Sequence, residues 1–129
     1  MRVVLLLLAL IVPISAGANG EEPEIVSLLN LLVAPKQFDG HRVRVIGFLA
    51  FEPESAMLYL HREDYEHNLV KNGIALRGGK DCNRLNLVYV MLDGTFEASA
   101  EPNKDVYTGF LRGISGCHAW HPAAPKSAS

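Results

Sequence analysis

Apolar and polar residues alternate along much of the chain beyond residue 40, and this period of two predicts β-strands. The clearest case is residues 42–51, where Val43, Val45 and Leu49 share one side with Gly47 between them. A glycine inside a strand typically marks a bulge or a sharp bend, which a strand that coils around a barrel needs. Further apolar runs at 56–60, 74–76, 86–96 and 106–114 predict the other strands of a five-stranded sheet.

A short amphipathic helix is expected ahead of the first strand. Residues 21–24 suit a first helical turn, because free backbone N–H groups there favour acidic side chains and tolerate Pro23. Apolar residues then recur at helical spacing and predict one buried stripe, made of Ile25, Leu28, Leu29 and Leu32. Pro35 should end this helix.

Residues 61–70 predict a second short helix or helical loop, which connects the second and third strands. Lys71, Asn72 and Gly73 should end it, because an Asn-Gly pair suits left-handed backbone angles. The expected fold class is therefore mainly β. It is a five-stranded barrel with an N-terminal helix and a short helix between strands 2 and 3.

Residues 1–18 have the order of a secretory signal peptide. Arg2 supplies a positive start, the apolar run 3–12 follows, and residues 15–18 are small. The apolar run is too short for a membrane-spanning helix, which needs about 20 residues. Cleavage near Ala18, with Ala16 as the alternative, would deliver a secreted or periplasmic protein. We expect one mature domain over 19–121, without a membrane span, and a disordered tail over 122–129.

The composition fits one globular domain, since the 129 residues are 49% hydrophobic and 20% charged. The formal net charge is −2, and it becomes −3 when Arg2 leaves with the signal peptide. Because the basic residues form no run, nucleic acid is not an expected partner. The chain does contain aromatic residues of the kind that stack on bases, namely Phe48, Phe51, Tyr59, Tyr65, Tyr89, Tyr107 and Phe110.

The two cysteines, Cys82 and Cys117, should form a structural disulfide in an oxidising compartment. Their midpoint falls at Ser99, in the polar loop between the last two strands. Residues equidistant from a hairpin turn face one another, so both cysteines should lie at the open end of that hairpin. Neither cysteine belongs to a C-x-x-C unit, which weighs against a redox-active pair or two metal ligands.

The stretch FDGHRVRVIGFL, residues 38–49, resembles the opening of many OB-fold domains, in which a DG turn leads into V-x-V-x-G-x-L. The tripeptides GTF at 94–96 and GFL at 109–111 fit the fourth and fifth strands of that fold, so the resemblance covers residues 36–116. Residues 59–76, YLHREDYEHNLVKNGIAL, together with VRVIGFL and YVMLDGTF, are also similar to a family of small secreted bacterial proteins. That resemblance implies an OB-fold barrel and an extracytoplasmic location, but no mechanism.

Residues 59–68 form the polar stretch that is richest in functional groups. The expected ligand-binding residues are Tyr59, His61, Glu63, Asp64, Tyr65 and His67. Glu63 and His67 lie one helical turn apart and could share a divalent ion, which His61 could also reach if the helix starts after it. No strong metal motif such as H-E-x-x-H is present. The alternative is an ordinary solvated helix face with a buried Tyr65.

A second candidate metal pair is His118 and His121, but Trp120 between them could instead cover the end of the barrel. No serine lies in a G-x-S-x-G elbow and no glycine loop has a phosphate-binding pattern, so we expect no catalytic residue and no cofactor. The sequence favours a secreted, non-enzymatic binding module for a protein, a peptide or a small polar ligand. The alternatives are a divalent-metal-binding or metal-dependent protein and a secreted hydrolase.

Overall fold

The computed structural model describes residues 11, 22–52 and 54–121. The predicted signal peptide and tail lie outside these residues, apart from Ile11. The strands are β1 (Glu24–Ile25), β2 (Arg42–Phe51), β3 (Ala56–Tyr59), β4 (Gly73–Leu76), β5 (Val88–Ala98) and β6 (Gly109–Ala119). The α-helices are α1 (Leu28–Val33) and α2 (Arg62–Glu66), and the 3₁₀ helices are η1 (Pro35–Phe38), η2 (Val70–Asn72) and η3 (Lys80–Cys82).

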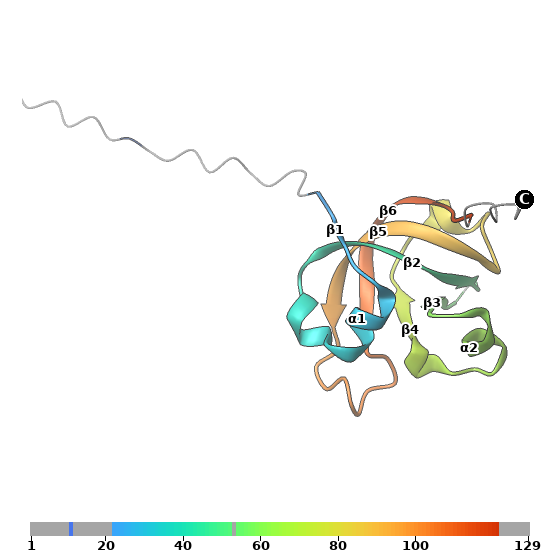
Figure 1. Cartoon of the computed structure of the whole chain (residues 1–129), viewed down its shortest axis with the longest axis horizontal. Helices are drawn as coiled ribbons and strands as arrows, with labels where there is room; N and C mark the ends of the chain where they lie inside the picture. The colour runs from blue at the N-terminus through green and yellow to red at the C-terminus, as the bar shows by residue number, and fades with distance from the viewer. Residues whose placement is uncertain (1–10, 12–21, 53, 122–129) are drawn as a thin grey trace, which may run out of the picture.

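Five strands close into a barrel in the order β2-β3-β4-β6-β5, because β2 pairs with β5 as well as with β3 (Figure 1). The closing pair is antiparallel and runs from Arg42 opposite Thr95 to Leu49 opposite Val88. β4 and β6 are parallel, and the other barrel pairs are antiparallel. This closed five-stranded barrel confirms the predicted OB-fold-like fold class, and β1 adds a short parallel strand to its edge at β2.

The inner sides of the strands form the main core, as the alternation predicted. Val43, Val45 and Leu49 of β2 are essentially inaccessible to solvent. No bulge occurs at Gly47 in the pairing of β2 with β5. The glycine is required for a different reason: a Cβ atom there would lie 2.6 Å from Leu58 Cγ and 2.9 Å from the Tyr59 carbonyl oxygen. Gly47 therefore lets β3 pack closely against β2.

The bulges of the barrel lie in the β5–β6 hairpin instead. The register shifts between Met91 and Asp93 and again between Asp93 and Thr95. The extra residues are on β6, where Gly113 and Gly116 have φ angles of 60° and 61°. A residue in this left-handed region is typical of bulges, and it explains why β6 needs glycines at these points.

The predicted start of the N-terminal helix is wrong. Residues Glu24–Ile25 are extended and pair with β2 as β1, and α1 begins only at Leu28. The Ser27 side chain accepts a hydrogen bond from the Asn30 N–H group and supplies the N-cap. The stripe is therefore shifted: Leu28 and Leu31 are buried in the barrel core, whereas Ile25 and Leu29 are 80% and 50% exposed.

The second predicted helix is present as α2, between the second and third barrel strands. The left-handed residue that ends its turn is Asn68, with a φ of 54°, and not the predicted Asn72-Gly73 pair. Gly73 is extended, with a φ of −144°. A Cβ atom at Gly73 would lie only 3.0 Å from the Tyr59 ring, so this glycine also serves close packing of β4 on β3.

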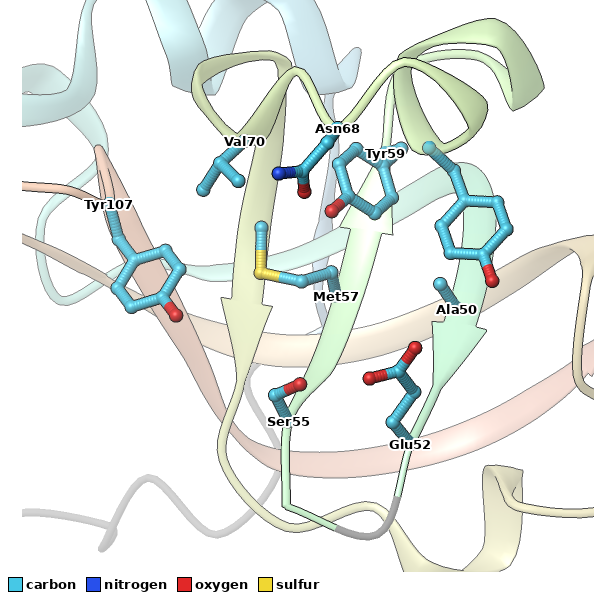
Figure 2. A pocket seen from close by; sticks show the side chains of 9 residues that line it. Ala50, Glu52, Ser55, Met57, Tyr59, Asn68, Val70 and Tyr107 are labelled. Atoms are coloured by element: carbon cyan, nitrogen blue, oxygen red, sulfur yellow. The ribbon is translucent and has the colours of Figure 1, made fainter.

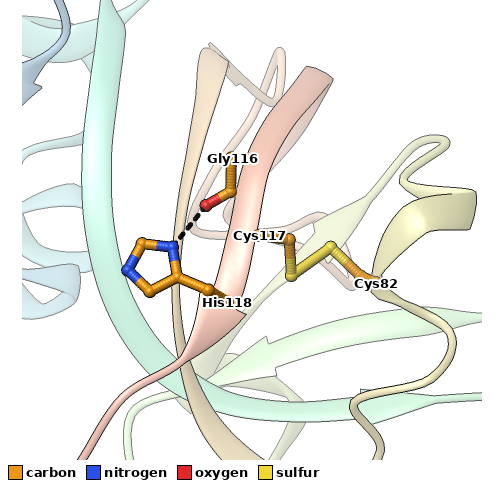
Figure 3. Close-up of a disulfide and its surroundings, with 4 residues drawn as sticks. All are labelled: Cys82, Gly116, Cys117 and His118. Carbon is orange, nitrogen blue, oxygen red and sulfur yellow. Dashed lines mark hydrogen bonds between the residues drawn. A yellow bond between two sulfur atoms is a disulfide. The ribbon is translucent and has the colours of Figure 1, made fainter.

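A disulfide joins Cys82 and Cys117, as predicted (Figure 3). The hairpin argument behind the prediction is wrong, because β6 begins at Gly109 and pairs it with Ala98, which puts the turn well beyond Ser99. Cys82 lies in η3, on the connection between β4 and β5, and both cysteines are buried. The bridge therefore ties this connection to β6. Among the described residues, no helix has the length and apolar character needed to cross a membrane.

Candidate functional site

The outer side of β2, β3 and β4 is also apolar, which is unusual for strands that form the wall of a small barrel. Side chains alternate between the two sides of a strand, so Phe48 and Ala50 point away from the core that Leu49 enters. We call this outer cluster the tyrosine face. Its buried members are Phe48, Ala50, Met57, Tyr59 and Ala75, and Tyr65, Val70, Tyr89, Tyr107 and Phe110 pack against them.

The rings of the tyrosine face contact one another at inclined angles. Tyr65 of α2 lies with its ring centre 5.9 Å from Phe48 and 5.9 Å from Tyr59. Tyr89 meets Phe48 edge to face, with centres 5.4 Å apart and planes at 70°. Such geometries stabilise aromatic clusters. All the aromatic residues singled out for stacking, apart from Phe51, belong to this face.

A pocket of about 200 Å³ opens in the tyrosine face (Figure 2). The strands supply its floor, and three connections supply its rim: the β2–β3 turn, the α2–η2 segment and the β5–β6 loop. The lining residues are Ala50, Glu52, Ser55, Met57, Tyr59, Tyr65, Asn68, Val70 and Tyr107. In Figure 2 Glu52 and Ser55 lie toward one end of the pocket, Asn68 and Val70 lie toward the other, and Met57 lies between them.

Tyr59 is buried at the centre of this arrangement. Its burial raises the pKa of the phenol above the ordinary value of 10.0, and the Glu52 carboxylate raises that pKa further, followed by Tyr107, Tyr65 and Asp64. Each of these groups disfavours the phenolate. The neutral phenol is therefore the form that the pocket holds.

Two arginines lie over rings of the tyrosine face. The Arg62 guanidinium lies 5.3 Å from the centre of the Phe48 ring, and that of Arg77 lies 3.8 Å from the centre of the Phe110 ring. The Arg62 backbone N–H also donates a hydrogen bond to the Tyr89 hydroxyl, 3.2 Å away. The two guanidinium–ring contacts have cation–π geometry, in which the electron-rich face of a ring attracts a positive charge.

The predicted ligand-binding residues separate into two groups. Tyr59 and Tyr65 line the pocket. Asp64 is the buried residue of α2. Its carboxylate accepts hydrogen bonds from the His61 backbone N–H and the Asn72 side chain, both at 2.9 Å. Asp64 thereby fixes the two ends of the segment that carries Tyr65, and its carboxylate is occupied by that role.

The remaining predicted residues, His61, Glu63 and His67, are exposed on the outer side of α2. The His67 ring donates a hydrogen bond from Nδ1 to the Glu63 backbone carbonyl, 2.8 Å away. His118 makes the corresponding bond to the Gly116 carbonyl (Figure 3). Within residues 22–52 and 54–121, no three His, Cys, Asp or Glu side chains come together in an arrangement that could hold a metal ion.

Of the lining residues, the sequence predicted only Tyr59 and Tyr65 as ligand-binding residues; it missed Ala50, Glu52, Ser55, Met57, Asn68, Val70 and Tyr107. The alternation over 56–60 could have placed Met57 on the side of Tyr59, since the two are two residues apart on one strand. The contributions of Glu52 and Tyr107 come from separate connections. Only the closure of the barrel brings these connections together, so no local signal could have joined them.

No protein-family model, curated protein or solved structure matches the chain. The resemblance to small secreted bacterial proteins accordingly stays a prediction.

Proposed function

We propose that the chain is a secreted or periplasmic, non-enzymatic binding module that holds its ligand in the pocket of the tyrosine face. The observation that carries this proposal is the position of the pocket. OB-fold barrels bind their ligands on the face of the second and third barrel strands, between the loops that follow the first and fourth strands. Here those strands are β3 and β4. The pocket is lined by Met57 and Tyr59 of β3 and by no described residue of β4, and the two loops supply Glu52, Ser55 and Tyr107.

The size and lining of the pocket favour a small polar ligand or one side chain of a peptide or protein. Pockets for drug-sized ligands typically measure about 300–1,000 Å³, and this one measures about 200 Å³. Tyrosine rings offer flat apolar area with a hydroxyl at the edge, which is typical of recognition surfaces. Glu52 disfavours a phosphate group, and this supports a ligand other than nucleic acid.

The disulfide supports the proposed compartment. Disulfides persist in secreted and periplasmic proteins and are rare where thiols are kept reduced. The Cys82–Cys117 bridge is fully contained in the barrel domain. The charged start, apolar run and small residues of positions 1–18 support export by a signal peptide.

The test is an NMR titration of the isotope-labelled mature protein with amino acids, monosaccharides and short peptides. We expect amide shifts to cluster at Ala50, Met57, Tyr59 and Asn68 for at least one class of ligand. The spectrum of that ligand should stay unchanged over hours, because the module binds without turnover. Shifts confined to another surface, or conversion of the ligand into a product, would contradict the proposal.

A further inference from the structure

The walls of the pocket are chemically suited to a positive charge. Tyr59, Tyr65 and Tyr107 line it together with the thioether of Met57. Figure 2 shows the rings of Tyr59 and Tyr107 on either side of Met57. Several aromatic rings around one small hollow can surround an ammonium group, and such aromatic cages attract it through the ring quadrupoles.

The charge of the residues that line the pocket also favours a cationic ligand. Glu52 is the only charged residue among the described residues that line it, and no lysine, arginine or histidine is among them. Lys71 follows the lining residue Val70 in the chain, and its ammonium group donates hydrogen bonds to the backbone carbonyls of Pro102 and Asp105. Lys71 therefore anchors the loop that carries Tyr107 and does not neutralise Glu52.

The flanking rings of the tyrosine face already hold cations that the chain itself supplies. Arg62 lies over Phe48 and Arg77 lies over Phe110, as described above. Three tyrosines of the same face line an open pocket instead. The same surface chemistry that binds two guanidinium groups is thus available in the pocket.

We infer that the pocket selects organic cations, and that it takes an ammonium group between its tyrosines and the Glu52 carboxylate. This inference rests on the proposed function and specifies the ligand class of that site. The ammonium group can belong to a free small molecule or to a lysine side chain of a peptide. Both sources present the same chemistry to the pocket, and the experiment separates them.

The first measurement compares choline with dimethylbutanol, the neutral compound in which a carbon atom replaces the choline nitrogen. The two probes match in shape and hydroxyl group and differ in charge. We expect choline to shift the amides around the pocket and to bind at least about tenfold more tightly than dimethylbutanol, since the rings and the carboxylate each favour the charge. Added salt should weaken choline binding and leave dimethylbutanol unaffected.

Two charge-removing variants of the same turn provide the matched control. Glu52 lines the pocket, whereas Glu54, two residues away and exposed, does not. Glu52→Gln should weaken choline binding roughly threefold to fivefold, and Glu54→Gln should change it less than twofold, because a surface charge acts mainly over short distances. Tyr107→Leu should weaken it to a similar extent as Glu52→Gln, because it removes one ring from the cage.

The source of the cation is distinguished with a trimethyl-lysine peptide. If the peptide binds more tightly than choline, the ammonium group of the ligand belongs to a polypeptide side chain. If choline binds at least as well as the peptide, the ligand is a free small molecule. Equal binding of choline and dimethylbutanol, or equal effects of Glu52→Gln and Glu54→Gln, would overturn the inference. Neutral sugars or amino acids that still bind in the pocket would then leave the proposed function standing, so the two failures are distinct.

Discussion

The buried carboxylate of Asp64 holds the His61 backbone and the Asn72 side chain, and so fixes the segment between β3 and β4. Asp64→Ala leaves these donors without their partner, and we expect it to lower the free energy of unfolding by about 2 kcal/mol. Glu63→Ala, an exposed neighbour on the same helix, should change it by less than about 0.5 kcal/mol. Urea unfolding followed by circular dichroism measures both. Equal effects of the two substitutions would show that Asp64 has no special structural role.

Ionisation of Tyr59 at alkaline pH lowers the stability of the fold. Its pKa in the folded protein is raised above 10.0 by burial and by Glu52, so the folded chain keeps this proton to higher pH than the unfolded chain does. The stabilising contribution is therefore complete below about pH 10 and is lost as the pH rises through the folded pKa. Glu52→Gln should shift the Tyr59 pKa downward, toward its ordinary value.

Ultraviolet absorbance of the phenolate measures this titration, and Tyr59→Phe identifies which step belongs to Tyr59. The variant should lose one tyrosine step above pH 10 and keep its stability to higher pH. If Tyr59→Phe instead removed a step at or below pH 10, burial and Glu52 would not raise the Tyr59 pKa as described.

At the scale of elements, alternation along the chain, together with short apolar runs, was enough to predict that each barrel strand exists, although the last strand spans Gly109–Ala119 and not the expected 106–114. It succeeded because the inner face of a barrel excludes polar residues at every second position. It also concealed the tyrosine face, since β2 and β3 are apolar on both sides and the outer cluster gives no separate signal. Boundaries were less predictable: the extended pairing of Glu24–Ile25 with β2 replaced a helical turn that the local residues favoured.

The loop between β5 and β6 was harder to predict than these boundaries. The chain from Ser99 to Thr108 contains Val106 and Tyr107, whose apolar side chains suggested a strand. Tyr107 instead packs on Phe110, with ring centres 5.7 Å apart, and the Lys71 ammonium group donates hydrogen bonds to the backbone carbonyls of Pro102 and Asp105. The Lys71 bonds join the loop to η2, which is distant in the chain, so no local pattern predicts them.

The close approach of β2 and β3 depends on Gly47. Gly47→Ala would place a Cβ atom against the Leu58 side chain and the Tyr59 carbonyl, and one of these contacts is rigid backbone. We expect a loss of about 2–3 kcal/mol in the free energy of unfolding. Gly40→Ala is the control, because Gly40 has a positive φ but open space around it, so it should cost only about 1 kcal/mol of backbone strain. A Gly47→Ala variant as stable as Gly40→Ala would contradict this account of the packing.

The candidate site exists only at the scale of the whole molecule. Tyr59 and Tyr65 come from the segment that the sequence singled out, and Glu52 and Tyr107 come from connections on either side of it. The exposed histidines of that segment drew attention because they are chemically versatile, yet they lie away from the pocket. Functional groups were visible in the sequence, but which of them face a common space is decided by barrel closure.

The disulfide acts on the molecule as a whole, because it joins the β4–β5 connection to the last strand across 35 residues. A crosslink of that span restricts the unfolded chain and stabilises the fold by roughly 3–4 kcal/mol in the chain-entropy model. The double variant Cys82→Ala with Cys117→Ala should lose about this much in urea unfolding. Reductant should destabilise the native protein toward the same value and leave the double variant unchanged, which is the matched control.

Because both cysteines are buried while the pocket lies on the outer face of other strands, the double variant should still bind choline under conditions in which it is folded. Loss of binding without loss of folding would mean that the bridge also shapes the tyrosine face.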